Sequence, residues 1–312
     1  MSGPFDRQRP AAGAFTATSF YVGLLAGLSA LGQFASNIVT PSLPAAAQAL
    51  AVGPGQIQWV MSVFLASFAV AQLIHGPLSD RFGRRRVLFA GLGLFLAGSG
   101  VAGTAGDLAT LLAGRALQAF GAGAGIVIAR AVIRDVFDGV EMTRVLALVT
   151  MVFGLVPGLT PLAGGIVQDG AGWRTAYAVA AAAGIGLALL AMRRLPETNP
   201  QPDPSLAWRH VAGTYGRVFG HGGFMRYALT VALVFASMSA FFAGSPAVFI
   251  AELGVSPTEY GLYPPLAVTG FFLGGMTTRR LSGRVAPARL ALTGLALMAV
   301  SAVAMAGTLQ AV

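Results

Sequence analysis

Long apolar runs alternate with short polar segments along almost the whole chain. Each run holds about 20 residues, enough for a helix to cross the roughly 30 Å of hydrocarbon in a bilayer. The pattern predicts nine membrane-spanning helices: Phe20–Thr40, Ile57–Pro77, Val87–Ala105, Leu108–Ile133, Val145–Val167, Arg174–Met192, Arg226–Ile250, Pro257–Met276 and Leu290–Leu309. The predicted fold class is therefore an all-α, polytopic membrane helical bundle.

Arginine residues lie mainly in every second loop between the predicted helices. The loops after the second, fourth, sixth and eighth helices contain Arg81, Arg84, Arg85, Arg86, Arg134, Arg144, Arg193, Arg194, Arg209, Arg217, Arg279, Arg280, Arg284 and Arg289. The positive-inside rule places these loops and the amino terminus in the cytoplasm. We expect a multi-pass protein of a bacterial inner membrane.

The composition supports a membrane protein and excludes several other classes. Of the 312 residues, 55% are hydrophobic and only 10% are charged, which is too little charge to cover a soluble domain of this length. The chain has no cysteine, which excludes a disulfide framework, a thiolate metal site and a cysteine nucleophile. The net charge of +9 lies in short loops between apolar spans, so we expect the lipid bilayer as a partner and no nucleic acid.

The longest loop, residues 193–225, divides the chain. It contains four prolines within nine residues, at positions 196, 200, 202 and 204, and proline favours extended linkers. We predict a six-helix amino-terminal bundle over 1–192, a cytoplasmic linker loop over 193–225 and a partial carboxyl-terminal bundle of helices seven to nine over 226–312. Two halves of six helices each are typical of transporters built from parallel repeats.

Three motifs carry a resemblance to a known family. They are "GPLSDRFGRR" at 76–85, "GRALQAFGAGAG" at 114–125 and "GLVPGLTPLAGG" at 154–165. They resemble the loop 2–3, span-4 and antiporter motifs of the major facilitator superfamily, and the two-proline form of the third is similar to the Bcr/CflA-type drug-resistance branch. The resemblance implies a twelve-helix transporter, so this chain would be incomplete at its carboxyl end.

The loop after the second helix is predicted to form a latch. A carboxylate at the end of a membrane helix is costly unless it is paired, and Asp80 has arginines within loop reach. Asp80, Arg84 and Asp135 would then hold the two halves of the transporter together in the outward-open state and release them in the inward-open state, and the resemblance implies the same role. Arginines that only fix the topology are the alternative. The predicted latch residues are Gly76, Asp80, Arg81, Gly83, Arg84, Arg85 and Asp135.

Arg115 is the most specific single candidate, because it lies in the fourth predicted helix about 10 Å below the outer boundary of the membrane. A cation at that depth needs a partner or water, or it extends toward the membrane surface. One hypothesis is that Arg115 points into a central cavity, where it would shift the protonation of a carboxylate or bind an anionic group of the substrate. Gln118 is close to one turn further on and would share that face.

The fifth predicted helix is the second candidate site. Pro157 and Pro161 each remove an intrahelical hydrogen bond, and Gly154, Gly164 and Gly165 leave a smooth surface. Such a helix suits a moving interface between the two halves and would seal it against proton leak. Ordinary packing of small residues is the alternative.

The first helix departs from the drug-resistance branch, which usually carries an aspartate where this chain has Asn37. No aspartate or glutamate lies in the middle of any predicted span, so proton coupling is implied by resemblance without an obvious carrier. Gln33 and Asn37, four residues apart on one helix face, are candidates for hydrogen bonds to a substrate. Polar contacts between helices are the alternative.

The combined prediction is a secondary active transporter that exports small amphipathic molecules or drugs, by proton antiport and alternating access. Its partners would be a small-molecule substrate and protons, and it would act as a monomer without a metal or cofactor. No span pairs histidines or acids as an enzyme site would need, so an enzyme is not expected. The alternatives are a metabolite exporter or uniporter without proton coupling, or a transport-incompetent truncated fragment.

Overall fold

The computed structural model describes residues 19–199, 208–281 and 284–310. Its helices are α1 (Ser19–Asn37), η2 (Thr40–Ser42), α2 (Leu43–Ala49), α3 (Pro54–Ile57), α4 (Trp59–Phe82), α5 (Arg84–Gly103), α6 (Leu108–Val136), α7 (Gly139–Ala171), α8 (Trp173–Arg194), α9 (Trp208–Gly220), α10 (Gly222–Pro246), η3 (Ala247–Glu252), α11 (Pro257–Tyr260), α12 (Tyr263–Leu281) and α13 (Pro287–Gln310). No strand occurs in these ranges, which confirms the all-α prediction.

Seven helices within the described residues are long and apolar enough to cross a membrane. They correspond to the first seven predicted spans, so that part of the prediction is confirmed. Most of the eighth predicted span forms α12, which does not meet this criterion, and the ninth forms α13, of which only a shorter apolar stretch is fully described. Arg279 and Arg280 lower the hydropathy at the end of α12, and Arg289–Ser301 is the apolar stretch of α13 within the fully described residues, so the ninth span stays a prediction.

The chain forms two compact units, divided in sequence after Pro264. The first unit contains α1 to α11, and the second contains most of α12 and all of α13. The predicted domain boundaries at 192 and 225 rest on the proline-rich segment and stay a prediction.

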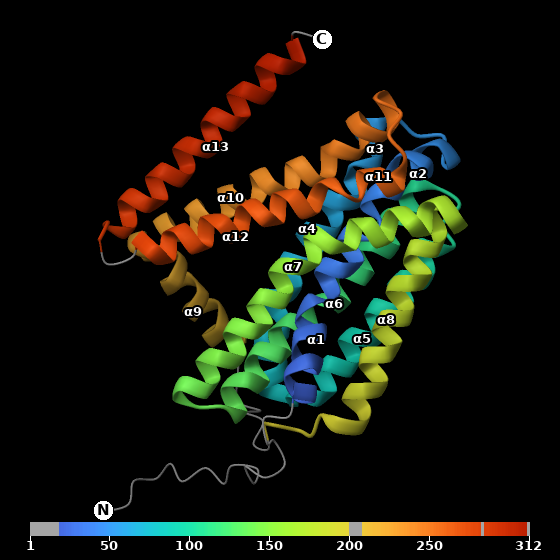
Figure 1. Ribbon diagram of the computed structural model, residues 1–312. Helices are drawn as coiled ribbons and strands as arrows, with labels where there is room; N and C mark the ends of the chain where they lie inside the picture. The colour runs from blue at the N-terminus through green and yellow to red at the C-terminus, as the bar shows by residue number, and fades with distance from the viewer. Residues whose placement is uncertain (1–18, 200–207, 282–283, 311–312) are drawn as a thin grey trace, which may run out of the picture. The chain divides into compact units, whose positions relative to one another are not determined.

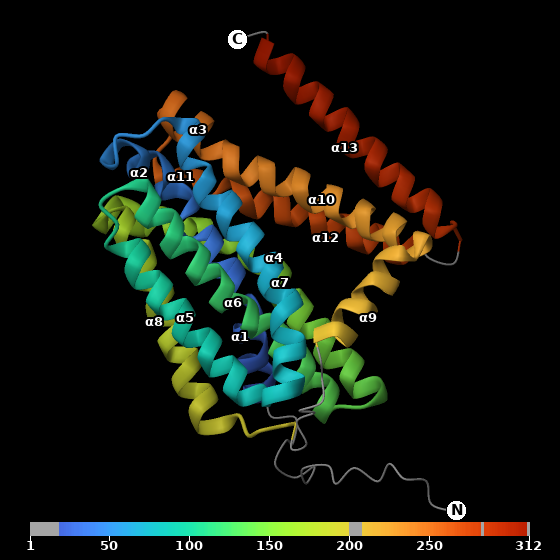
Figure 2. The same cartoon turned by 180° about the vertical axis from the view of Figure 1, so that it is seen from behind.

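Within the first unit, α1 and α6 lie between α4, α5, α7 and α8 (Figures 1 and 2). Glycines allow the close approach of α5 to α6. A Cβ atom at Gly114 would lie 2.5 Å from the backbone nitrogen of Ala102, so only glycine fits there. Along α5, the apolar core is filled by Leu88, Leu92 and Phe95.

Part of the predicted linker loop is helical, because α9 occupies residues 208–220. Val211, Tyr215 and Phe219 recur at the four-residue spacing of one helix face, which is the pattern of an amphipathic helix. The Tyr215 hydroxyl donates to the Leu73 carbonyl of α4 at 2.9 Å. Residues 200–207, with three of the four linker prolines, lie outside the described residues.

Candidate functional site

The predicted latch residues Asp80, Arg84 and Asp135 come together at the junction of α4, α5 and α6. The Arg84 Nε donates to Asp135 Oδ2 at 3.1 Å, and one terminal nitrogen of Arg84 forms an ion pair with Asp80. The same nitrogen donates to the Ser79 hydroxyl at 2.6 Å. The Arg84 side chain is only 12% exposed, against 49% for Asp80 and 24% for Asp135, so one largely covered guanidinium joins two acids.

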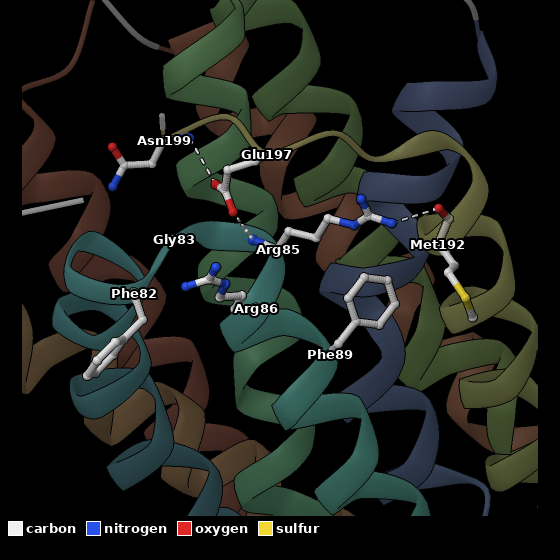
Figure 3. A pocket seen from close by; sticks show the side chains of 8 residues that line it. All are labelled: Phe82, Gly83, Arg85, Arg86, Phe89, Met192, Glu197 and Asn199. Atoms are coloured by element: carbon white, nitrogen blue, oxygen red, sulfur yellow. Dashed lines mark hydrogen bonds between the residues drawn. The ribbon is translucent and has the colours of Figure 1, made fainter. Parts of the chain in front are cut away.

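The segment after α8 completes this network, and sequence reasoning missed it. The Glu197 carboxylate accepts the backbone N–H groups of Arg84 at 2.9 Å and Arg85 at 3.0 Å, which are the first two residues of α5. Figure 3 shows the bond from Arg85. The carboxylate thus satisfies helix donors that have no partner inside the helix, and its negative charge complements the helix dipole. The buried Thr198 donates from its hydroxyl to Asp135 Oδ2 at 3.0 Å, and the Asn199 side chain donates to a backbone carbonyl at the end of α4.

The two predicted motif glycines differ in what the structure requires of them. Gly83 joins α4 to α5 at φ +94°, a conformation that side chains disfavour, and a Cβ atom there would lie 2.7 Å from Glu197 Oε2. A Cβ atom at Gly76 would meet nothing closer than a Val127 methyl group at 3.9 Å. Of these two motif positions, only position 83 requires glycine.

Arg81 and Arg85 lie at the edge of the latch without pairing to its acids among the described residues. The Arg81 guanidinium lies over the Phe82 ring at 5.2 Å. Arg85 donates to the Met192 carbonyl at 3.0 Å and lies over the Phe89 ring at 5.6 Å. Arg85 therefore ties α5 to the end of α8.

All the described partners of Asp80, Arg84 and Asp135 precede residue 200. The network thus connects helices of the first predicted half, and its contact with the second half stays a prediction. A cavity of about 330 Å³ adjoins it and is also lined by Arg130 and Arg134 of α6. The carboxylates and guanidiniums of this region face one shared space.

Arg115 is fully buried in the first unit and does not extend toward the surface. One of its terminal nitrogens donates to the Ala35 carbonyl of α1 at 3.0 Å and to Gln118 Oε1 at 2.7 Å. Its guanidinium lies over the Phe64 ring of α4, 4.1 Å from the ring centre. No carboxylate forms an ion pair with it among the described residues, so the predicted role in a cavity stays a prediction.

Gln118 continues the network from Arg115 toward α5. Its side-chain nitrogen donates to the Ser99 hydroxyl at 2.9 Å, and Ser99 donates to the Phe95 carbonyl at 2.7 Å. The buried Arg115 Nε and the Tyr177 hydroxyl make no hydrogen bond with any described group. The predicted sharing of a helix face by Arg115 and Gln118 is observed as a direct hydrogen bond.

Gln33 and Asn37 also contact one another. The Asn37 side-chain nitrogen donates to the Gln33 carbonyl at 2.7 Å and to its side-chain oxygen at 3.3 Å. Asn37 is buried, at the end of α1. These amide groups are thus paired within one helix, and their binding of a substrate stays a prediction.

The predicted antiporter helix is α7, which continues through Pro157 and Pro161 without ending. Gly164 lies against the backbone of Ile38 in the turn after α1, and Gly165 lies against the backbone of Pro257 in α11. A Cβ atom at either glycine would collide with a backbone oxygen. Gly154 is partly buried on the same helix.

Hydrogen bonds that sequence reasoning missed strengthen the contact between α7 and α11. Asp169 Oδ2, near the end of α7, accepts the backbone N–H of Thr258 at 3.1 Å and also its hydroxyl. Ser256 and Glu259 form a capping box at the start of α11, and its hydrogen bonds lower the pKa of Glu259. Because α7 runs back from the end of α6, this contact lies at the opposite end of the helices from Asp135.

Comparison with known protein families matches residues 11–311 to the Major Facilitator Superfamily. The chain belongs to this superfamily. Multidrug resistance protein D of Escherichia coli (strain K12) is 33% identical over 261 residues, which cover 84% of this chain and 66% of that protein. The chloramphenicol resistance protein of Pseudomonas aeruginosa is 31% identical over 267 residues, 85% of this chain and 61% of that protein. The bicyclomycin resistance protein homolog of Haemophilus influenzae is 26% identical over 247 residues, 79% and 62% of the two chains.

Solved structures of the superfamily share the fold. A bacterial homolog of the human lysosomal transporter Spinster, in an inward-facing and unoccupied conformation, has a TM-score of 0.69 at 17% identity and covers 86% of this chain and 64% of that one. The human organic anion transporter MFSD10 has a TM-score of 0.57 at 18% identity, with 84% and 70% coverage. At these identities the likeness shows the fold alone.

The comparisons confirm the predicted superfamily and its Bcr/CflA-type drug-resistance branch. The superfamily consists of multi-pass membrane transporters, and the seven apolar helices fit that architecture. The chain spans less than two thirds of the length of these three relatives.

Proposed function

We propose that the chain belongs to a secondary transporter that exports small amphipathic molecules or drugs across a bacterial inner membrane. It would work by proton antiport and alternating access, as a monomer with its amino terminus in the cytoplasm. The observation that carries this proposal is the network in which Arg84 joins Asp80 and Asp135. Topology alone would require the arginine, but it would not require two acids around it.

Alternating access needs contacts that hold one end of the helices closed while the other end opens. The two candidate contacts here lie at opposite ends. At one end is the network of Arg84, and at the other Asp169 of α7 binds Thr258 of α11. The acids and hydroxyls in both contacts form hydrogen bonds that can be broken and formed again, as a reversible switch requires.

The relatives supply the substrate class. Three of them carry drug-resistance names, for multiple drugs, chloramphenicol and bicyclomycin. Gly164 and Gly165 of α7 pack closely against the turn after α1 and against α11, as a smooth surface at a moving helix contact would require. We therefore propose an apolar or amphipathic substrate rather than a sugar or peptide.

The test is export of a fluorescent drug from drug-sensitive bacterial cells that express this protein. Export that stops when a proton uncoupler is added supports the proposal. Asp80→Asn should slow export strongly while leaving membrane insertion unchanged, and Glu141→Gln, which removes an exposed acid of α7, serves as the matched control. Full export by Asp80→Asn, at normal abundance in the membrane, would refute the role of the latch.

A transporter without proton coupling is the second candidate, and the pairing of Asn37 with Gln33 favours it. An amide does not titrate, and the middle of the spans contains no aspartate or glutamate that would take its place. Export or uptake that persists with the uncoupler present, and that follows only the substrate gradient, would support this candidate over antiport.

A further inference from the structure

We propose that a cavity at the start of α5 binds the phosphate-bearing headgroup of an anionic phospholipid. The cavity has a volume of about 790 Å³ and is lined by Arg85, Arg86, Phe82, Phe89, Met192 and Glu197, among others (Figure 3). It is separate from the cavity beside Asp80 and Asp135. The proposal depends on the membrane location of the chain and does not depend on its substrate or on proton coupling.

The position of the cavity along α5 matches the depth of lipid headgroups. The 20 residues of α5 would span about 30 Å, close to the thickness of the hydrocarbon layer. Its first turn, which carries Arg85 and Arg86, therefore lies at the membrane interface. Phe89 lies about one turn deeper and faces the level of the acyl chains.

The walls of the cavity combine apolar groups, which suit the acyl chains of a lipid, with basic groups, which suit an anionic headgroup. Phe82 is 47% exposed and Met192 is 53% exposed, which leaves apolar surface that acyl chains can cover. Arg85 uses part of its guanidinium to bind the Met192 carbonyl and keeps other donors. Arg86 is exposed and forms no hydrogen bond or ion pair that the described residues show.

The charge balance of the cavity favours an anion. Two arginines face one carboxylate, that of Glu197. Both Glu197 oxygens already accept backbone N–H groups, from Arg84, Arg85 and Asn199, so its charge is offset by the start of α5. Arg86 therefore remains the strongest unmatched charge, and basic pockets between membrane helices are a known form of lipid site.

The experiment uses the full chain in lipid nanodiscs. Its thermal unfolding is measured in phosphatidylcholine alone, with phosphatidylglycerol replacing part of the phosphatidylcholine, and in phosphatidylcholine with inorganic phosphate in the buffer. Lipids that remain bound after mild detergent extraction are identified by native mass spectrometry. We expect stabilisation and a retained lipid only with phosphatidylglycerol.

The variant Arg86→Gln should lower retention of phosphatidylglycerol about fivefold, the ratio expected for one arginine near an anionic surface. Arg86→Lys keeps the charge and should retain most of the binding. Arg144→Gln removes an exposed arginine of α7 outside the cavity and is the matched control. If Arg86→Gln itself unfolds, Arg85→Gln tests the same loss of retention.

Two results would overturn the proposal. One is equal retention of phosphatidylglycerol by Arg86→Gln and Arg144→Gln, which would mean a diffuse attraction to the membrane surface. The other is equal stabilisation by inorganic phosphate, which would mean a site for a soluble anion.

Discussion

Replacing Glu197 by alanine should destabilise the protein by about 2 kcal/mol. The carboxylate accepts backbone N–H groups from Arg84 at 2.9 Å, Arg85 at 3.0 Å and Asn199 at 3.0 Å. Loss of a helix-capping side chain costs about 0.5–2 kcal/mol, and loss of a favourable charge at a helix start costs about 0.3–1 kcal/mol. The adjoining cavity lets water reach the freed donors, which keeps the sum well below the cost of three fully buried unpaired groups.

The assay is thermal unfolding of the purified protein in one detergent, where about 2 kcal/mol corresponds to a fall in Tm of about 4 °C. Glu197→Gln keeps one oxygen acceptor but loses the charge, so its Tm should lie between those of Glu197→Ala and the unmodified chain. Glu252→Ala, which truncates an exposed acid of η3, should leave the Tm unchanged. If Glu197→Ala and Glu252→Ala melt at the same temperature, the capping role is refuted.

Three further predictions follow from the same structure. Gly83→Ala should lower the free energy of unfolding by about 2 kcal/mol, from its positive φ and the collision with the neighbouring carboxylate, whereas Gly76→Ala should leave thermal unfolding nearly unchanged. Arg115→Met should change stability by less than about 2 kcal/mol, because relief of a buried charge offsets the lost bonds to the Ala35 carbonyl and Gln118. The same variant should abolish export if Arg115 acts in transport, and normal export would exclude that role. The pKa of Glu259 lies below its ordinary value of 4.5, so its capping box should stabilise the protein above pH 4.5 and lose this contribution as the pH falls further. Glu259→Gln should therefore flatten the dependence of Tm on pH in this acid range, and an unchanged dependence would contradict the assignment.

The latch could be predicted from the sequence because its parts are local or carried by motifs. Asp80 and Arg84 are four residues apart across a glycine that turns the chain, which brings their side chains within reach. The position of Asp135 follows from the membrane topology, which places the end of the fourth span on the same side as the loop after the second. The structure brings all three together.

Glu197 could not be assigned from its neighbours in sequence, where Pro196 and later prolines suggest only a linker. Its partner is the start of a helix more than 100 residues earlier, and such a pairing depends on which helices are neighbours. One signal was available. The sixth predicted span ends on the same side of the membrane as the third begins, so a carboxylate there is a candidate cap.

Other contacts depend on helix rotation, which hydrophobic periodicity does not fix in a chain that is apolar almost throughout. Sequence placed Arg115 inside a span but did not show that it contacts Phe64 and the Ala35 carbonyl. Likewise, nothing in the pattern pairs Asp169 with Thr258, because their helices are separated by almost 90 positions.

The segment from Glu197 to Asn199 belongs to the predicted linker that begins at residue 193, yet it is bound to the first predicted half. Thr198 binds Asp135 and Asn199 binds the Asp80 carbonyl, so the chain that leaves α8 is fixed to the latch before it continues. The chain is therefore held by the latch as far as Asn199, several residues beyond the end of α8. Any movement that separates Arg84 from its two acids also displaces the anchor points of this segment. The latch and the connection between the halves are thus one mechanical element, and a mutation in either should alter the other.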